Sequence, residues 1–122
     1  MARSRFRALV VALLAVALVA GAVVVVRAAE ISLTVVNVVS PQDVKIWEPT
    51  SIAAKKGDRI ALRLVNKHAD EHGYEIAAFG VKEVVPGDKT ATVSFTADRA
   101  GVFPIKCHLH PAHVVGQLIV LE

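Results

Sequence analysis

A thiol and several imidazoles stand close together near the end of the chain. The stretch CHLHPAHVVG, residues 107 to 116, holds the only cysteine of the sequence and three of its five histidines. Cys107, His110 and His113 are spaced at i, i+3 and i+6, so one loop can aim three donors at a single point. Thiolates and imidazoles are ligands that suit copper and zinc. The spacing therefore predicts a metal site and leaves the choice between these two metals open.

Two other interpretations of this cluster compete with metal binding. A polar turn without chemistry would rarely gather three histidines beside the only cysteine. A cysteine nucleophile with a histidine base would need an orienting Asn or Asp and a substrate cleft, for which a domain this small offers little room. Metal binding is therefore favoured over both.

A further ligand is expected from another part of the chain, and His72 in EHGYEI is the best placed. In a strand that starts there, His72, Tyr74 and Ile76 share one face, which aims the imidazole at the end of the core. His68 could supply this ligand in place of His72, but it belongs to a loop and is expected to face water. The predicted metal ligands are His72, Cys107, His110 and His113.

Short β-strands are expected to position these ligands. After Glu30, runs rich in Val, Ile, Thr and Phe are divided by Gly, Pro, Asn and Asp about every ten residues, which is typical of an all-β sandwich. Alternation in VFPIKC places Phe103, Ile105 and Cys107 on one face, so the thiol ends a strand and points inward. The expected strands cover residues 31–39, 51–54, 59–65, 74–77, 82–85, 90–95, 102–107 and 117–121.

Two further side chains are expected to play no direct part in the site. His108 follows Cys107 directly, so strand alternation turns it to the opposite side, as an outer or surface group. Trp47 in KIWEP is expected to cap the sandwich rather than to carry a function.

The N-terminus carries the pattern of a membrane-directed segment. Three arginines within the first seven residues precede nineteen uninterrupted apolar residues, 8–26. Arg27 follows directly after this apolar run. Such a segment is a secretory signal or an anchor, and its basic start places the remainder outside the cytoplasm. Nineteen residues are enough to span the roughly 30 Å of hydrocarbon, so an anchor is favoured over a cleaved signal. Residues 1–29 are predicted to form this signal or anchor helix, and residues 30–122 a single domain.

The charge balance of that domain argues against nucleic acid as a partner. Ten Lys and Arg stand against eleven Asp and Glu after residue 27, a net charge of −1. With one cysteine, an intramolecular disulfide is impossible.

Taken in order, these motifs resemble the cupredoxin family, small Greek-key β-sandwiches that hold copper between the end of one strand and a later Cys–His loop. The resemblance covers most of residues 45–122 and runs through KKGD, HGY, VVPGDKTATVSFTADRAGVF and C-x-x-H-x-x-H-x-x-G followed by QLIV. The flanks are most similar to the copper domain of cytochrome oxidase subunit II and nitrous oxide reductase, whose dinuclear site requires two cysteines. With one cysteine, the resemblance implies a mononuclear copper centre.

The loop itself resembles that of amicyanin-type blue copper proteins, with Cys, His at +3 and an axial Met at +6. The resemblance implies that Cys107 is the thiolate, that His72 and His110 are equatorial ligands, and that His113 replaces the methionine. Met1 is the only methionine, so the domain has no thioether ligand. An axial imidazole is a stronger donor, which implies a lower reduction potential and a green or red centre rather than a blue one.

The expected function is single-electron transfer between redox partner proteins by a periplasmic, membrane-anchored copper protein. Such a protein binds no small-molecule substrate and is not an enzyme by itself. Leu109, Pro111 and Ala112 around His110 are expected to form the patch where a partner docks. The first alternative is a periplasmic copper chaperone or copper-resistance protein, which is disfavoured because the domain contains no methionine. The second alternative is a zinc-bound structural module.

Overall fold

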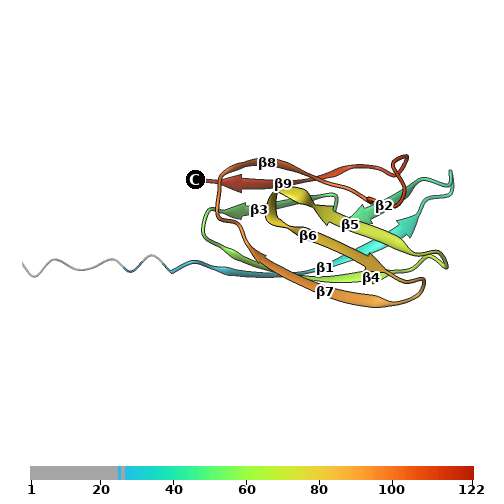
Figure 1. Ribbon diagram of the computed structural model, residues 1–122, viewed down its shortest axis with the longest axis horizontal. Coiled ribbons are helices and arrows are strands. Elements are labelled where there is room, and N and C mark those ends of the chain that lie inside the picture. Colours follow the sequence, from blue (N-terminus) through green and yellow to red (C-terminus); the bar gives the residue numbers. More distant parts are fainter. Residues whose placement is uncertain (1–24, 26) are drawn as a thin grey trace, which may run out of the picture.

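The computed structural model describes Val25 and residues 27–122 (Figure 1). Nearly all of the predicted signal or anchor helix, residues 1–29, therefore lies outside the described residues. Within the described part, no helix has the length and apolar character needed to cross a membrane.

The described residues form a chain of short strands with a single 3-10 turn, which confirms the predicted all-β architecture. Strand β2 was not predicted, and the other strands lie within a few residues of their expected ranges. The elements are β1 (Glu30–Val39), β2 (Lys45–Glu48), β3 (Ser51–Lys55), β4 (Arg59–Asn66), β5 (His72–Ile76), η1 (Ala77–Phe79), β6 (Val81–Val85), β7 (Thr90–Thr96), β8 (Gly101–Ile105) and β9 (Gly116–Leu121).

The strands form two layers (Figure 1). One layer is a four-stranded sheet in the order β2-β1-β4-β7. The other holds the sheet β3-β9-β8 and the hairpin β5-β6, which an antiparallel bridge between Glu75 and Lys106 connects. Strand β1 runs parallel to β4, and β3 runs parallel to β9, so neighbours within a sheet are distant in the chain.

Alternating side chains fill the space between the layers. In β4, Ile60, Leu62 and Leu64 are fully buried, whereas Arg59 and Arg63 face solvent, as the sequence predicts. Burial of these large side chains is the main source of the stability of the fold, at roughly 1.5–3 kcal/mol for each one fully buried. The remaining core residues are Val35, Trp47, Ile52, Ala54, Tyr74, Ile76, Val81, Val85, Ala97, Ile105, Leu118 and Val120.

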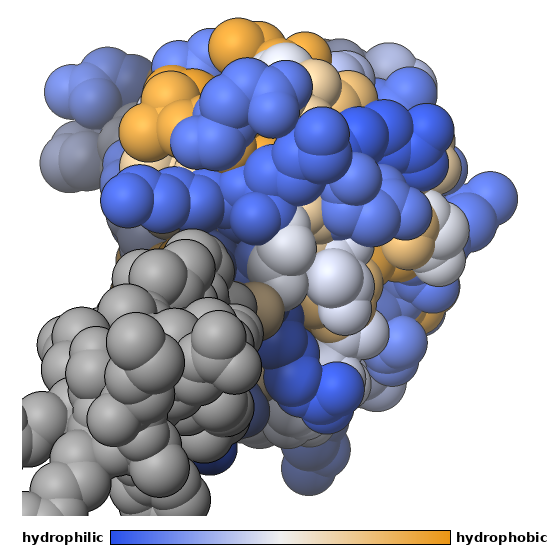
Figure 2. Space-filling view, turned by 90° about the vertical axis from the view of Figure 1, so that its left-hand side faces the viewer, coloured by the Kyte–Doolittle hydropathy of each residue, from blue (hydrophilic) through white to orange (hydrophobic). Residues whose placement is uncertain are grey.

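Four loops gather at one end of the sandwich, those between β1 and β2, β4 and β5, β6 and β7, and β8 and β9 (Figure 1). The described chain begins at the opposite end, where the C-terminus also lies. Asp58 ties down this opposite end, because its carboxylate accepts hydrogen bonds from the backbone N–H groups of Ala29 and Lys55 at 3.0 and 2.8 Å. The visible surface of this end is mainly hydrophilic (Figure 2).

Candidate metal centre

The thiol of Cys107 lies inside the loop end of the sandwich, with 4% of the residue exposed. Strand β8 ends at Ile105, two residues earlier than predicted, and the mutual backbone hydrogen bonds of Glu75 and Lys106 continue its direction. The inward direction of Cys107 that alternation predicts is therefore confirmed, although the residue follows the strand rather than ending it. The backbone N–H of Gly73 donates to Sγ over 3.1 Å.

Two consecutive turns bring His110 and His113 back toward the thiol. The N–H of His110 donates to the carbonyl of Cys107 at 3.3 Å, and the N–H of His113 donates to the carbonyl of His110 at 3.0 Å. Each turn advances the chain by three residues, which explains why donors at i, i+3 and i+6 face one point. The N–H of Val114 then donates to the carbonyl of Lys45, which fixes the end of the loop to β2.

His72 is the first residue of β5, which starts two residues before the expected range 74–77, and its imidazole is buried as predicted, with 1% of the residue exposed. Its ring centroid lies 5.2 Å from that of His110 and 5.0 Å from that of His113. Its Nδ1 is buried and has no hydrogen-bond partner among the described residues, and the same holds for Nδ1 of His113. Two buried ring nitrogens without partners are costly in a folded protein unless a ligand occupies them.

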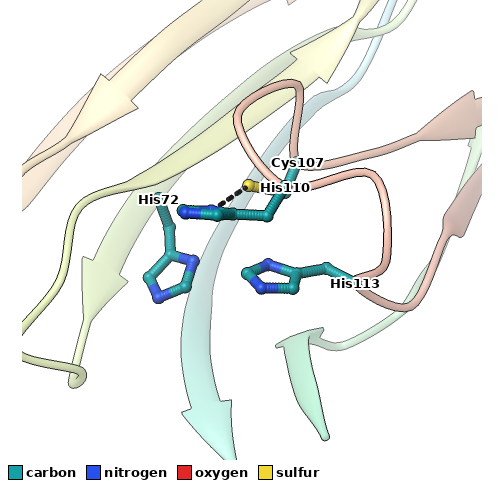
Figure 3. A group of neighbouring side chains, drawn as sticks. All are labelled: His72, Cys107, His110 and His113. Carbon is teal, nitrogen blue, oxygen red and sulfur yellow. Dashed lines mark hydrogen bonds between the residues drawn. The ribbon is translucent and has the colours of Figure 1, made fainter.

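The structure thus brings all four predicted ligands together at the loop end (Figure 3). One donor atom from each lies within 4.8 Å of the donors of the others. Nδ1 of His110 approaches Sγ of Cys107 to 3.4 Å. One thiol and three imidazoles in this arrangement fit a single copper or zinc ion, with two of the ligands buried and two partly exposed.

The backbone of Gly73 makes hydrogen bonds to two residues at the centre. Besides its N–H bond to Cys107, its carbonyl accepts a hydrogen bond from Trp47 Nε1 at 2.9 Å. A Cβ at this position would lie 2.6 Å from Nδ1 of His108, so the imidazole of His108 covers the glycine directly. A side chain at this glycine of the HGY motif would therefore displace the imidazole of His108.

Three expectations about neighbouring residues are refined by these contacts. His68 was predicted to face water, which is wrong, because its Nδ1 lies 3.0 Å from Nε2 of His72 and only a quarter of its side chain is exposed. Trp47 is a buried aromatic that packs edge-on against Tyr74, as expected, and it also holds Gly73. His108 is an outer group that contacts the backbone of the centre rather than the ligand cluster.

Burial and neighbouring imidazoles oppose protonation of the cluster. Burial first, and then the positive charge that His113 and His110 would carry, lowers the pKa of His72 from 6.5 to about 4. Burial likewise lowers the pKa of His113, with further contributions from His110 and Lys45. The imidazoles of His72 and His113 are therefore neutral at pH 7, the form in which they bind metal ions.

The metal-free protein is expected to lose stability as the pH falls from about 6.5 toward 4. In this window the unfolded chain binds a proton at His72 that the folded chain excludes, so the free energy of unfolding decreases with falling pH. Urea denaturation at a series of pH values measures this slope. His72→Leu should reduce the slope, with the contribution of His113 remaining, and an equal stability of the unaltered protein at pH 7 and pH 4.5 would contradict the expectation.

The fold and the donor set together define a small β-sandwich protein with a site for one metal ion. Residues 8–120 match the model of the family described as Cupredoxin-like domain, so the chain belongs to this family. The resemblance inferred from the motifs is thereby confirmed, and copper is the metal ion that the family and the donor set assign to the site.

Parts of known proteins are similar to this chain in sequence or in fold. The chain is 41% identical over 56 residues to a nitrous-oxide reductase of Cupriavidus necator, an alignment that spans 43% of this chain and 9% of the reductase. The copper nitrite reductase from Nitrosomonas europaea matches 75% of this chain and 41% of its own, with a TM-score of 0.65 and 19% identity. The metal binding domain of the Streptococcus pneumoniae D39 Cu(I) exporting P-type ATPase CopA matches 79% of this chain and 97% of its own, with a TM-score of 0.59 and 13% identity. At these identities the two structural matches show the fold alone.

Proposed function

We propose that this protein is a mononuclear copper protein that carries single electrons between redox partner proteins. The observation that carries the proposal is the buried thiol of Cys107, which accepts a backbone N–H bond and faces three imidazoles. One thiolate with imidazoles and a weak further ligand is the donor set of electron-transfer copper sites. The proposed ligands are His72, Cys107, His110 and His113.

Bound copper would supply a one-electron Cu(II)/Cu(I) couple. The contribution of the chain is to hold the donors in one geometry in both oxidation states, so that little rearrangement accompanies electron transfer. Strand β5 fixes His72, the bridge between Glu75 and Lys106 holds the start of the loop, and the bond from Val114 to Lys45 holds its end. A frame of this kind suits an electron carrier better than a site that must open to release its metal.

Apolar side chains beside the site supply a surface for redox partners. Leu109 is 36% exposed and Val115 55% exposed, and Pro111 and Ala112 are exposed as well. They belong to the loop that carries His110, whose half-buried imidazole edge is the proposed exit for the electron. The visible surface of the opposite end is mainly hydrophilic, with a few apolar residues at its edge, which favours docking at the loop end (Figure 2). No chemistry on a small-molecule substrate is included in this proposal.

The proposal includes an extracytoplasmic location and an N-terminal membrane anchor. Its support is the basic and apolar pattern of residues 1–27. The described chain starts at the end opposite the loops, so an anchor would leave the copper site facing away from the membrane (Figure 1). N-terminal sequencing of the protein recovered from membranes tests this part, since loss of the first residues would mean a cleaved signal.

Copper delivery is the alternative function. The similarity in fold to a metal binding domain of a Cu(I) exporting ATPase favours it, as do the two partly exposed imidazoles. The absence of methionine from the domain speaks against it, because thioethers are soft ligands that favour Cu(I). A zinc-bound structural module is the third candidate.

Reduction in the presence of a Cu(I) chelator distinguishes these functions. The Cu(II)-loaded protein is reduced with ascorbate and then reoxidised with ferricyanide, with excess bathocuproine disulfonate present throughout. An electron carrier should accept one electron per copper, recover its visible spectrum on reoxidation and keep its metal. Rapid transfer of copper to the chelator after reduction would support delivery instead, and tight Zn(II) binding without any visible band from Cu(II) would contradict the proposed electron transfer.

A further inference from the structure

We propose that His68 is a positioning residue of the copper site, which accepts a hydrogen bond from Nε2 of His72 and thereby leaves Nδ1 of His72 free for copper. His68 is not among the four proposed ligands, and its loop precedes β5. The inference rests on the proposed copper site and adds to it a named partner for one of its ligands. Ligating histidines commonly donate their second ring N–H to an acceptor that fixes their tautomer and orientation.

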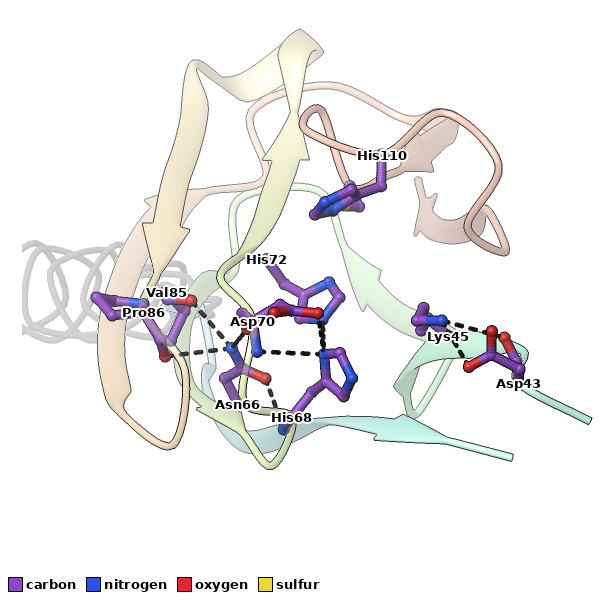
Figure 4. A network of polar contacts seen from close by, with 10 residues as sticks. Asp43, Lys45, Asn66, His68, Asp70, His72, Val85, Pro86 and His110 are labelled. Atoms are coloured by element: carbon purple, nitrogen blue, oxygen red, sulfur yellow. Dashed lines mark hydrogen bonds and ion pairs between the residues drawn. The ribbon is translucent and has the colours of Figure 1, made fainter. Parts of the chain in front are cut away.

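The backbone N–H of Asp70 indicates the direction of the hydrogen bond between His68 and His72, because a backbone N–H can donate but not accept. Nδ1 of His68 lies 3.0 Å from Nε2 of His72 and 3.4 Å from the backbone N–H of Asp70 (Figure 4). A backbone N–H only donates, so Nδ1 of His68 presents its lone pair on this side. With this tautomer of His68, Nε2 of His72 carries the hydrogen and donates it, and the buried Nδ1 of His72 keeps its lone pair.

The tautomer of His72 determines which of its nitrogens can bind a metal ion. With the hydrogen on Nε2, Nδ1 of His72 carries a lone pair. This Nδ1 is the buried atom without a hydrogen-bond partner among the described residues. Figure 3 shows a ring nitrogen of His72 directed toward Cys107 and His110. The contact with His68 thus prepares His72 for copper before copper arrives.

The carboxylate of Asp70 is the competing partner of His68. Its Oδ2 lies 3.5 Å from Nδ1 of His68, farther than Nε2 of His72 at 3.0 Å, and its side chain is 75% exposed. The contact with His72 is shorter and more buried, so it decides which nitrogen of His72 carries the hydrogen.

A rigid loop holds His68 in this place. The backbone N–H of His68 donates to Oδ1 of Asn66 at 3.0 Å, and Nδ2 of Asn66 donates to the carbonyls of Asp70 and Val85 at 2.7 and 3.1 Å (Figure 4). Asn66 is 1% exposed, so these bonds are protected from water.

The turn between β6 and β7 supports the same loop from outside. The N–H of Asp88 donates to the carbonyl of His68 at 3.0 Å. A Cβ at Gly87 would lie 1.8 Å from the carbonyl oxygen of Ala69, so only glycine allows this close approach. Since the loop is already ordered, His68 can orient His72 without a further loss of backbone entropy.

The tautomer of His72 in the metal-free protein tests the proposal without any substitution. Long-range ¹H–¹⁵N correlation spectra at neutral pH distinguish a protonated Nε2 from a protonated Nδ1. The proposal requires the hydrogen on Nε2 of His72 and an unprotonated Nδ1 on His68. A hydrogen on Nδ1 of His72 would overturn it.

Substitution of His68 tests the consequence for copper. His68→Leu removes the acceptor, and the affinity for Cu(II) should fall about 10–100-fold with a changed electron paramagnetic resonance spectrum. His68→Asn places an amide oxygen near the position of Nδ1 and should restore most of the affinity. Lys67→Leu, at the exposed neighbouring position, is the matched control and should bind Cu(II) as the unaltered protein does.

The outcomes separate this inference from the proposed function. Unchanged Cu(II) affinity and spectra in His68→Leu would overturn the role of His68 while the copper site stands. If the unaltered protein bound no Cu(II) but showed the expected tautomer, the proposed function would fail and the contact between the two histidines would remain.

Discussion

Cys107→Ser is expected to abolish the strong visible absorption of the Cu(II)-loaded protein. That absorption arises from charge transfer between a thiolate and Cu(II), and Cys107 is the only thiol of the chain. The affinity for Cu(II) should fall by more than the roughly 10–100-fold that loss of an outer partner costs, because a metal ligand itself is removed. Absorption spectra during titration with Cu(II) measure both effects.

The fold should tolerate this substitution. The serine hydroxyl is close in size to the thiol, and its oxygen can accept the N–H of Gly73 that now points at Sγ. Val102→Ser is the matched control, since Val102 is 64% exposed on β8 and has no donor role. It should keep the absorption band. A band of unchanged intensity in Cys107→Ser would show that the thiol is not a copper ligand and would remove the basis of the proposed electron transfer.

The composition of the centre could be predicted because it depends on local information. Side chains in a strand alternate between its two faces. This alternation predicts that Cys107 in VFPIKC and His72 in HGYEI point toward the core. The spacing of His110 and His113 fits two successive turns, each closed by one backbone hydrogen bond. These relations need only the order of residues within a strand or a loop.

The surroundings of the centre could not be predicted because they depend on contacts between distant segments. Strand β2 has four residues, too few for a clear alternation, and its pairing with β1 defines it. The position of His68 depends on Asn66 and on the turn between β6 and β7, which lies some twenty residues further along the chain. A histidine four residues before a predicted ligand was the one local sign of this contact.

The predicted docking end follows from topology rather than from local pattern. The sequence places Leu109 and Pro111 beside His110, but only the arrangement of the two sheets brings four loops to one end and both described termini to the other (Figure 1). This separation leaves the site accessible to a partner at a distance from the start of the domain.

His113→Met is expected to raise the reduction potential of the copper site and to shift its absorption toward that of a blue copper protein. His113 stands six residues after Cys107, and its buried Nδ1 has no other partner among the described residues. An imidazole is a stronger donor than a thioether and stabilises Cu(II), so its replacement favours Cu(I) and strengthens the bond to the thiolate.

Spectroelectrochemical titration of the copper-loaded variant measures the potential and the spectrum together. Val114→Met is the matched control, because it adds a thioether at the next, 40% exposed position while His113 stays in place. It should leave both quantities unchanged. If His113→Met also left both unchanged, His113 would be excluded from the ligand set. The centre would then have three protein ligands and an open position, a geometry that favours copper delivery over electron transfer, since an incoming ligand could bind there and draw the metal away.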